Sequence, residues 1–273
     1  MAQDAKKRRP IPARAILRYG GVAVIMCVVL TGGIYASQRF EQFLIRDPRF
    51  FLSGPPDYGL ESPTVQLSGV KYASREAILR LFNQDYGRSI YLFPMVARRR
   101  ALLNITWVEN ASIVRVWPDH VVVTVTERNP VAFIKVPAGG ITRWALIDSQ
   151  GVILDPPQKA AFQLPVLTGL SMTENPAQRA RRVRRMQQLM KELGPLSDNV
   201  SEVDASDLDD LKITGQMQGR AVSLLMGDRN FSPRLKNFLE HFPDIHRRMP
   251  RAAAFDLRLD DRITGLEDAG NAR

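Results

Sequence analysis

The stretch VWPDHVVVTVTERNP, from Val116 to Pro130, carries the clearest strand signal in the sequence. Pro118 and Asp119 predict a turn, and the alternation that follows predicts a strand from Val121 to Glu127. Pro130 cannot donate to a strand ladder, so it marks the point where the chain leaves the first sheet. Successive side chains of a strand point to opposite faces. The side chains expected on the buried face are Val121, Val123 and Val125.

A charged pair, Glu127 and Arg128, lies at the end of this stretch, just before Pro130. We expect these residues at the junction between two domains. A salt bridge or a polar contact between domains is the simplest role for the pair. Docking of a partner protein is the alternative.

The residues before this strand predict two helices and two further strands. Ser74 fits the N-cap of a helix that ends at Gly87, and Pro94 fits the first turn of a second helix. The order strand, helix, helix, strand, strand predicts an α+β unit over residues 64–130, with two helices on one face of a small sheet. Its predicted strands are residues 64–67, 113–117 and 121–127.

After this unit the pattern changes to short strands separated by turns. It predicts a mostly antiparallel β-domain over residues 131–267, with a flexible C-terminus at 268–273. The domain is expected to end in a hairpin of residues 253–259 and 262–266. The other predicted strands are residues 132–136, 144–148, 152–154, 165–167, 200–203, 211–213 and 222–226.

Two amphipathic stretches of the β-domain predict helices. One runs from Asn175 to Leu193, and the other begins at Ser232. The basic run from Arg179 to Arg185 is interrupted by apolar residues at helical spacing. We expect its arginines on the solvated face of the first helix, and contact with peptidoglycan or anionic lipid is the alternative.

The first 63 residues predict a membrane anchor. Residues 19–38 carry no charge, and twenty residues of helix span roughly 30 Å of hydrocarbon. Residues 1–18 form a basic tail that holds half of the net charge of +10, so the N-terminus is expected in the cytoplasm. Residues 39–63 are expected to form a stalk. A cleaved signal peptide is the alternative, since small residues near Ala36 follow the basic segment.

The sequence lacks the groupings that catalysis needs. Its single cysteine, Cys27, lies in the apolar span, so no disulfide can form within one chain. His241 and His246 are five residues apart, which does not match a zinc-binding helix, and the acidic cluster at 204–210 suits a solvated turn. We therefore expect a binding module and no enzyme. We also expect no cofactor, no metal, no small-molecule substrate and no nucleic acid partner.

The run from Trp107 to Phe133 resembles the diagnostic segment of FtsQ/DivIB-type cell division proteins. It has a Trp-Val pair, an arginine and a Trp-Pro turn, a strand, and then Glu-Arg-x-Pro-Val-Ala. The resemblance implies a short cytoplasmic tail, one transmembrane helix, a polypeptide-transport-associated (POTRA) domain and a β-domain. It covers nearly all of the chain after the stalk, and continues at residues 66–69, 144–152, 164–169 and 255–258.

The resemblance also implies partners. Proteins of this family recruit the small division proteins FtsB and FtsL, with FtsB at the last strand and hairpin of the β-domain. A partner strand would then add to an exposed sheet edge, with Leu259 and Ile263 in apolar contact and Arg258 and Arg262 attracting acidic residues. Family members often have aromatic residues where this chain has leucines. The implied partner-binding residues are Arg258, Leu259, Arg262, Ile263, Thr264, Gly265 and Leu266.

The resemblance further implies a location at the division septum. The chain would cross the bacterial inner membrane once, with its N-terminus in the cytoplasm and its bulk in the periplasm. The POTRA domain also serves outer-membrane translocation machines. POTRA-type polypeptide transport or chaperone activity is therefore the alternative function, although those machines carry several such domains and a β-barrel.

Overall fold

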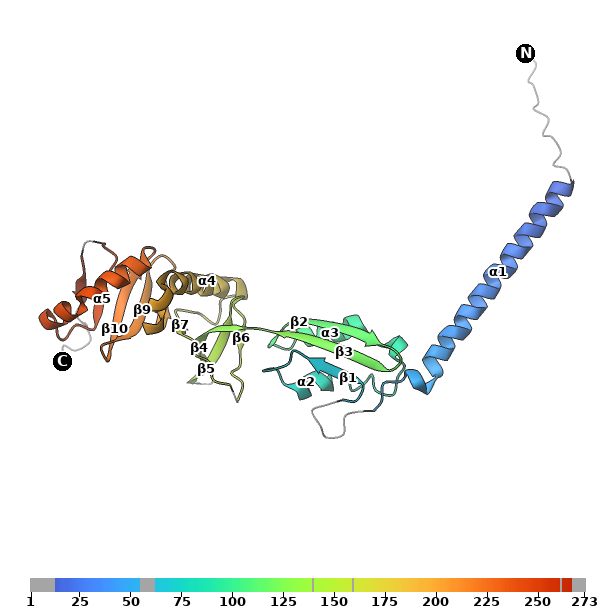
Figure 1. The fold of residues 1–273 in the computed structure, drawn as a ribbon, viewed down its shortest axis with the longest axis horizontal. Coiled ribbons are helices and arrows are strands. Elements are labelled where there is room, and N and C mark those ends of the chain that lie inside the picture. Colours follow the sequence, from blue (N-terminus) through green and yellow to red (C-terminus); the bar gives the residue numbers. More distant parts are fainter. Residues whose placement is uncertain (1–12, 55–61, 139, 159, 261, 267–273) are drawn as a thin grey trace, which may run out of the picture. The chain divides into compact units, whose positions relative to one another are not determined.

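The computed structural model describes residues 13–54, 62–138, 140–158, 160–260 and 262–266 (Figure 1). The chain divides into two compact units. Two segments that the sequence predicts in the first domain, residues 69–74 and 101–111, group with the second unit. The first unit contains Met1–Ser68, Arg75–Arg100 and Ser112–Thr124, and the second contains Gly69–Ser74, Ala101–Ala111 and Val125–Arg273.

The first unit begins with one long helix, α1 (Ala13–Arg46). Its stretch Gly21–Arg46 is long and apolar enough to cross a membrane. Large apolar side chains such as Val24 and Ile25 are 64% and 65% exposed, as expected for a helix whose surroundings are lipid. The helix continues past Gln38, where the sequence predicts the apolar span to end.

The segment after α1 is tied to the rest of the first unit by backbone hydrogen bonds. It passes through the short helix η1 (Pro48–Phe50) and reaches Leu52, which is buried. The N–H of Leu52 donates to the carbonyl of Arg88 at 3.0 Å, and its carbonyl accepts from the N–H of Gly87 at 2.9 Å. The first part of the expected stalk therefore packs on the folded unit.

A three-stranded sheet follows, with the strand order β1-β3-β2. The alternation predicted for β3 is confirmed, because Val121, Val123 and Val125 are all at most 3% exposed. Strand β1 pairs in parallel with β3, and β2 begins five residues earlier than predicted. The elements are β1 (Val65–Ser68), α2 (Arg75–Arg80), η2 (Ile90–Leu92), α3 (Met95–Leu103), β2 (Val108–Val116) and β3 (His120–Glu127).

A nine-stranded sheet forms the second unit, with the order β12-β11-β10-β9-β8-β7-β4-β5-β6 among the described residues. Three neighbouring pairs are parallel, namely β4 with β7, β7 with β8, and β10 with β11. The other pairs are antiparallel, which confirms a mostly antiparallel β-domain. The strands are β4 (Pro130–Ala138), β5 (Ile141–Asp148), β6 (Ile153–Leu154), β7 (Val166–Thr168), β8 (Val200–Asp204), β9 (Leu211–Met217), β10 (Arg220–Gly227), β11 (Ala254–Asp256) and β12 (Thr264–Leu266).

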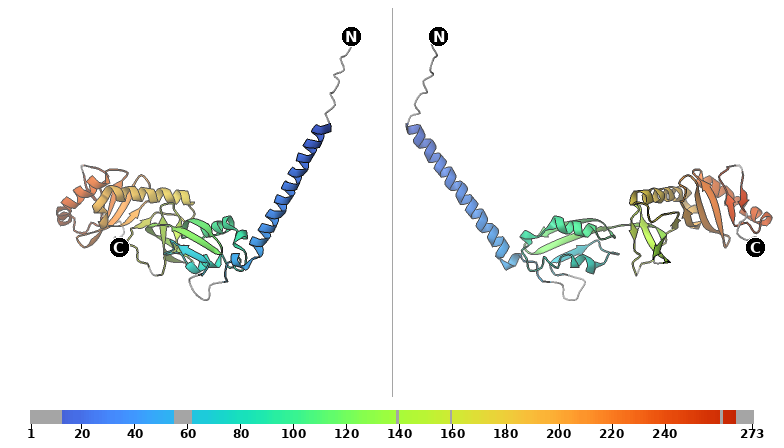
Figure 2. Two further views of the ribbon diagram at one scale, coloured as in Figure 1. Left: turned by 45° about the vertical axis from the view of Figure 1, so that its right-hand side comes forward. Right: turned by 180° about the vertical axis from the view of Figure 1, so that it is seen from behind.

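Helices α4 (Pro176–Leu193) and α5 (Phe231–Arg248) lie beside these strands, and the short helix η3 (Gly194–Asn199) follows α4 (Figures 1 and 2). Both predicted helices are confirmed, and their apolar stripes join the strands in one core. Gly151 allows the close approach at the start of α4. Its φ is 78°, and a Cβ there would lie 2.3 Å from the carbonyl oxygen of Pro176.

Three arginines of α4 differ from the expected solvated face. Arg179, Arg182 and Arg185 are partly buried, and each donates to the backbone of a neighbouring loop. Arg181 and Arg184 are exposed as predicted. The three partly buried arginines therefore hold α4 against loops next to the sheet. Their acceptors are the carbonyls of Gly151, Ser206 and Leu208, each at 2.8 Å.

Candidate partner-binding site

Strand β12 lies at one end of the larger sheet. It pairs in antiparallel fashion with β11, and within the described residues no strand pairs with its other side. The predicted hairpin is present, but its strands are shorter than expected, at three residues each. Such an edge leaves a row of backbone donors and acceptors without partners in the sheet.

The hydrogen-bond pattern indicates which backbone groups of β12 face outward. Leu257 N donates to the carbonyl of Leu225 at 2.9 Å, so the odd-numbered residues around β11 turn their backbone groups to β10. The even-numbered residues turn theirs to β12, where Asp256 pairs with Thr264. By the same alternation, the N–H and C=O of Gly265 point to the open side.

A buried arginine, Arg234, holds the connection between β11 and β12. Its side chain is 7% exposed and makes four hydrogen bonds. The bond to Asp260 lowers the pKa of that carboxyl below its usual value. Since the carbonyl of Arg258 is one of the acceptors, the connection is held outside the ladder. The four acceptors are the carbonyls of Met226 at 2.7 Å, Arg229 at 2.9 Å and Arg258 at 2.6 Å, and the carboxylate of Asp260 at 2.7 Å.

Arg234 accounts for the short strands of the hairpin, and the sequence did not single it out. It follows Pro233 at the start of an ordinary amphipathic helix, directly before Leu235, the first of the apolar positions that predicted α5. No local pattern distinguishes an arginine that binds four distant acceptors from one that faces solvent. Only the folded chain brings these acceptors together.

The surface beside the connection between β11 and β12 has two hollows. One hollow of about 410 Å³ and a second of about 310 Å³ lie along α5, and Ile263 lines both. Leu259, at 58% exposure, lies at the first hollow, and Arg262 lies at the second. These two hollows together form a groove along α5. Its apolar side chains Leu259 and Ile263 lie in the segment that leads into β12.

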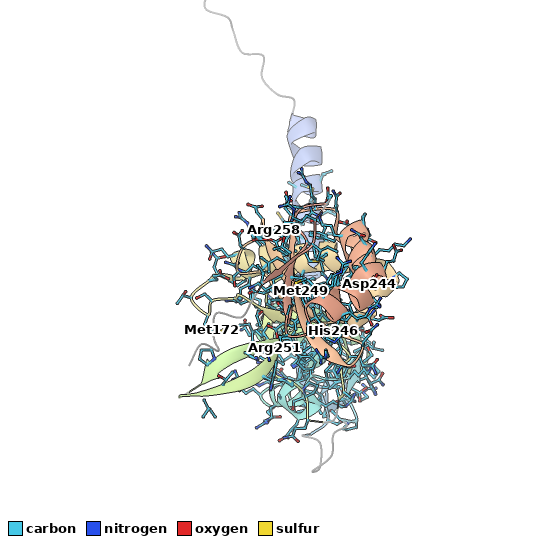
Figure 3. All side chains as sticks on the ribbon, turned by 90° about the vertical axis from the view of Figure 1, so that its left-hand side faces the viewer. Met172, Asp244, His246, Met249, Arg251 and Arg258 are labelled. Carbon is cyan, nitrogen blue, oxygen red and sulfur yellow. The ribbon has the colours of Figure 1, made fainter. Side chains whose placement is uncertain are left out.

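Arg258 is committed to carboxylates of its own chain. Its guanidinium contacts Asp256 at 2.6 Å and Asp210 at 3.1 Å. The hydrogen bond between Arg258 and Asp256 raises the pKa of the guanidinium and lowers that of the carboxyl. Arg258 is labelled in Figure 3.

The other predicted residues lie along the same segment in different settings. Arg262 is exposed, and the described part of the chain gives it no ion pair. Ile263 is partly buried against the core, and Thr264 is exposed. Gly265 is closely packed, because a Cβ there would lie 2.8 Å from the sulfur of Met249, also labelled in Figure 3. Leu266 is partly exposed.

Glu127, Arg128 and Pro130 each have a separate structural role within the second unit. Arg128 donates to the buried Asp148 at 2.8 Å and does not pair with Glu127. Pro130 opens β4 of the larger sheet, where it pairs with Asp148, after β3 of the smaller sheet ends at Glu127, so it lies where the chain leaves the first sheet as predicted. The Glu127 carboxylate accepts bonds of 2.9, 2.9 and 2.7 Å from the backbone N–H groups of Lys71, Tyr72 and Ala73.

Together these features define a chain with one helix apolar and long enough to cross a membrane, a POTRA-type domain, and a second β-domain that ends in an open strand. The comparison with protein families agrees. The FtsQ-type POTRA domain matches residues 62–128, and the C-terminal region of cell division protein FtsQ/DivIB matches residues 138–258.

Several proteins similar to this chain are named cell division protein FtsQ. Cell division protein FtsQ of Koribacter versatilis is 30% identical over 265 residues, which cover 94% of this chain and 73% of that protein. FtsQ of Syntrophotalea carbinolica is 22% identical over 98% of this chain and 92% of its own, and FtsQ of Zymomonas mobilis is 29% identical over 54% and 44%. The chain belongs to the FtsQ family of cell division proteins, which are non-enzymatic scaffolds.

Proposed function

We propose that this protein is an inner-membrane scaffold of the divisome that recruits FtsB-type and FtsL-type proteins at the septum. Its N-terminus lies in the cytoplasm and its two sheet domains lie in the periplasm. Family membership supports the role in division. The basic tail of residues 1–18, before the uncharged span, supports the orientation, because positively charged segments favour the cytoplasmic side.

The observation that carries this proposal is the open edge of β12. A strand of the FtsB-type partner adds there and exchanges hydrogen bonds with the N–H and C=O of Gly265. Each backbone hydrogen bond contributes about 1 kcal/mol, so a three-residue strand alone gives modest affinity. Apolar side chains of the partner add to it by entering the groove beside Leu259 and Ile263.

Charge selects the partner through Arg262 more than through Arg258. Arg258 already binds Asp256 and Asp210, so a partner carboxylate would have to compete with two from this chain. Arg262 is exposed at the edge of the groove. An acidic residue next to the partner strand would therefore bind Arg262 and favour correct register.

The test compares two substitutions at Ile263. Ile263→Pro removes the N–H that continues the outward series from Gly265, and the ring hinders a partner strand. Ile263→Val keeps the N–H and the branched side chain. In a titration of the full chain with the periplasmic part of FtsB, we expect a loss of about tenfold or more for proline, the equivalent of one or two backbone hydrogen bonds. We expect the valine variant to bind within about twofold of the wild type.

Ile263→Val keeps both the N–H and a branched apolar side chain, so it is the control for substitution at this position. Wild-type affinity in the proline variant would exclude strand addition at β12. Thermal unfolding of both variants checks the fold, since an edge strand tolerates proline better than a central strand.

A further inference from the structure

The end of the first unit that contacts α1 has an unusual combination of exposed apolar and basic side chains. We propose that this surface rests on the membrane and binds the headgroups of anionic phospholipids. The surface consists of the last turn of α1, η1, η2, the start of α3 and the turn between β2 and β3. This inference is independent of the partner strand proposed at β12.

The depth of this surface follows from one hydrogen bond. Ser89 Oγ donates to the carbonyl of Leu44 at 2.6 Å, which joins the residue before η2 to the end of α1. Leu44 is six residues past Gln38, or roughly 9 Å along a helix. The headgroup layer on each side of a bilayer is roughly 5 to 8 Å thick. A helix that places Gln38 at the edge of the hydrocarbon therefore places Leu44, and with it Ser89 before η2, at the outer edge of the headgroup layer.

Side chains at this level suit that position. Leu92 of η2 and Val96 of α3 are 55% and 67% exposed. Leu92 and Ile45 of α1 line one hollow of about 560 Å³, which also includes Arg88. Exposed apolar side chains at headgroup level lose their contact with water when they enter the boundary of the acyl chains.

Aromatic rings mark the same level. Phe43 of α1 packs edge-on against Phe50 of η1 at 5.6 Å, and Phe50 packs in the same way against Trp117 at 5.7 Å. Trp117 is 48% exposed at the turn between β2 and β3. Tryptophan favours the membrane interface because its ring is apolar and its N–H can stay hydrated.

Charge identifies the lipid class. Arg46 at the end of α1, Arg88 in the turn before η2, and Arg100 of α3 are exposed. The acidic residues of this region have partners. Asp85 is buried and takes two hydrogen bonds from Arg98, of 2.6 and 3.0 Å, Asp47 pairs with Arg49 at 2.7 Å, and Asp119 contacts the ring of His120 at 2.7 Å. The exposed charge is therefore positive, and it complements phosphatidylglycerol or cardiolipin and not a zwitterionic lipid.

The experiment uses the full chain in nanodiscs with no partner protein. Cys27→Ser removes the native thiol, and Val96→Cys carries a spin label. We expect the label to be protected from an aqueous nickel reagent in discs that contain phosphatidylglycerol, and much less in discs of phosphatidylcholine alone. A label at Ile141→Cys, in the second unit and 72% exposed in the native chain, should stay accessible in both.

Charge reversal supplies the matched control. Arg88→Glu with Arg100→Glu should lower the equilibrium constant for membrane contact by about 25-fold or more, because each basic residue near an anionic surface contributes about 1 kcal/mol. Arg181→Glu with Arg184→Glu changes the net charge equally on the exposed face of α4 and should leave the protection unchanged. Equal accessibility at Val96 and Ile141, equal protection in both lipids, or full protection after reversal at Arg88 and Arg100 would each overturn the proposal.

Discussion

Arg234 shows how one side chain sets the geometry of the candidate site. Its four hydrogen bonds join the end of β10, the start of α5 and the connection before β12. A buried arginine that loses one acceptor leaves unpaired charge, and carbonyls that lose their donor are unpaired as well. The residue is therefore expected to matter for stability as well as for the position of β12.

Arg234→Met tests this directly. The substitution keeps an apolar chain of similar length but removes every hydrogen bond, and we expect the free energy of unfolding to fall by about 3 kcal/mol. Arg234→Lys should recover only part of the loss, because one ammonium group cannot span the four acceptors. Urea unfolding of the full chain in detergent measures both. Arg184→Met, on the exposed face of α4, should change stability by less than about 0.5 kcal/mol. A loss at Arg234 no larger than this would contradict the assignment.

A second residue prediction concerns acid stability. The hydrogen bonds from Arg182 hold the pKa of Glu174 below its usual value, although partial burial opposes the shift. A carboxyl whose pKa is lower in the folded state stabilises that state above its unfolded pKa, and the stability is lost as the pH falls through the lower folded value. The loss should begin near pH 4.5, close to the ordinary pKa of glutamate.

Glu174→Gln should reduce the free energy of unfolding at pH 7 by about 1 kcal/mol and should flatten its dependence on pH below 4.5. The two proteins should converge in stability as the pH is lowered further. Denaturant unfolding at a series of pH values measures the slopes. Glu240→Gln, at an exposed position of α5, serves as the control and should keep the wild-type slope. If Glu174→Gln also kept the wild-type slope of unfolding free energy against pH, Glu174 would not be the group that links stability to pH.

At the scale of elements, regular local patterns were predictable. The alternation of β3 and the apolar stripe of α4 both appear in the structure at the predicted residues. These patterns are strong because one buried face imposes a period of two residues on a strand and about 3.6 on a helix. The N-cap at Asn175 and the stop at Gly194 then limit α4 to within a residue of the prediction.

Pairings between distant segments were not predictable from local pattern. The three-residue strand β7 lies between β4 and β8, and both of its neighbours run parallel to it. Residue pattern alone does not specify such neighbours, because each is chosen by the packing of the whole core. The partly buried arginines of α4 follow the same rule. Their charge predicts solvent, but loop carbonyls that come from elsewhere in the chain provide alternative partners.

The position of the partner-binding site stays a prediction, and the setting of its residues was not predictable in detail. The resemblance to the FtsQ/DivIB family pointed to the last hairpin, and the residues alone would not have done so. The open edge depends on β11 lying between β10 and β12, a strand order that only the folded sheet reveals. Likewise, the engagement of Arg258 with Asp210, 48 residues away, has no trace in the local sequence.

At the scale of the whole molecule, the proposed scaffold predicts a cellular phenotype. Depletion of the protein from its native host should give filaments whose septa fail to constrict, as fluorescence microscopy with a membrane dye would show. Expression of the Ile263→Val variant should restore division, whereas the Ile263→Pro variant should not. Normal division combined with defective outer-membrane assembly would instead favour the alternative role in polypeptide transport.

The two backbone hydrogen bonds that join Leu52 to Gly87 and Arg88 have a mechanical consequence. Leu52 is six residues past the end of α1, so little slack separates the membrane helix from the folded unit. Rotation of α1 about its own axis therefore rotates the folded unit with it. A shift of one residue in helical register corresponds to a rotation of about 100°. A neighbouring helix in the bilayer that fixed this rotation would choose which flank the unit presents to the proteins around it.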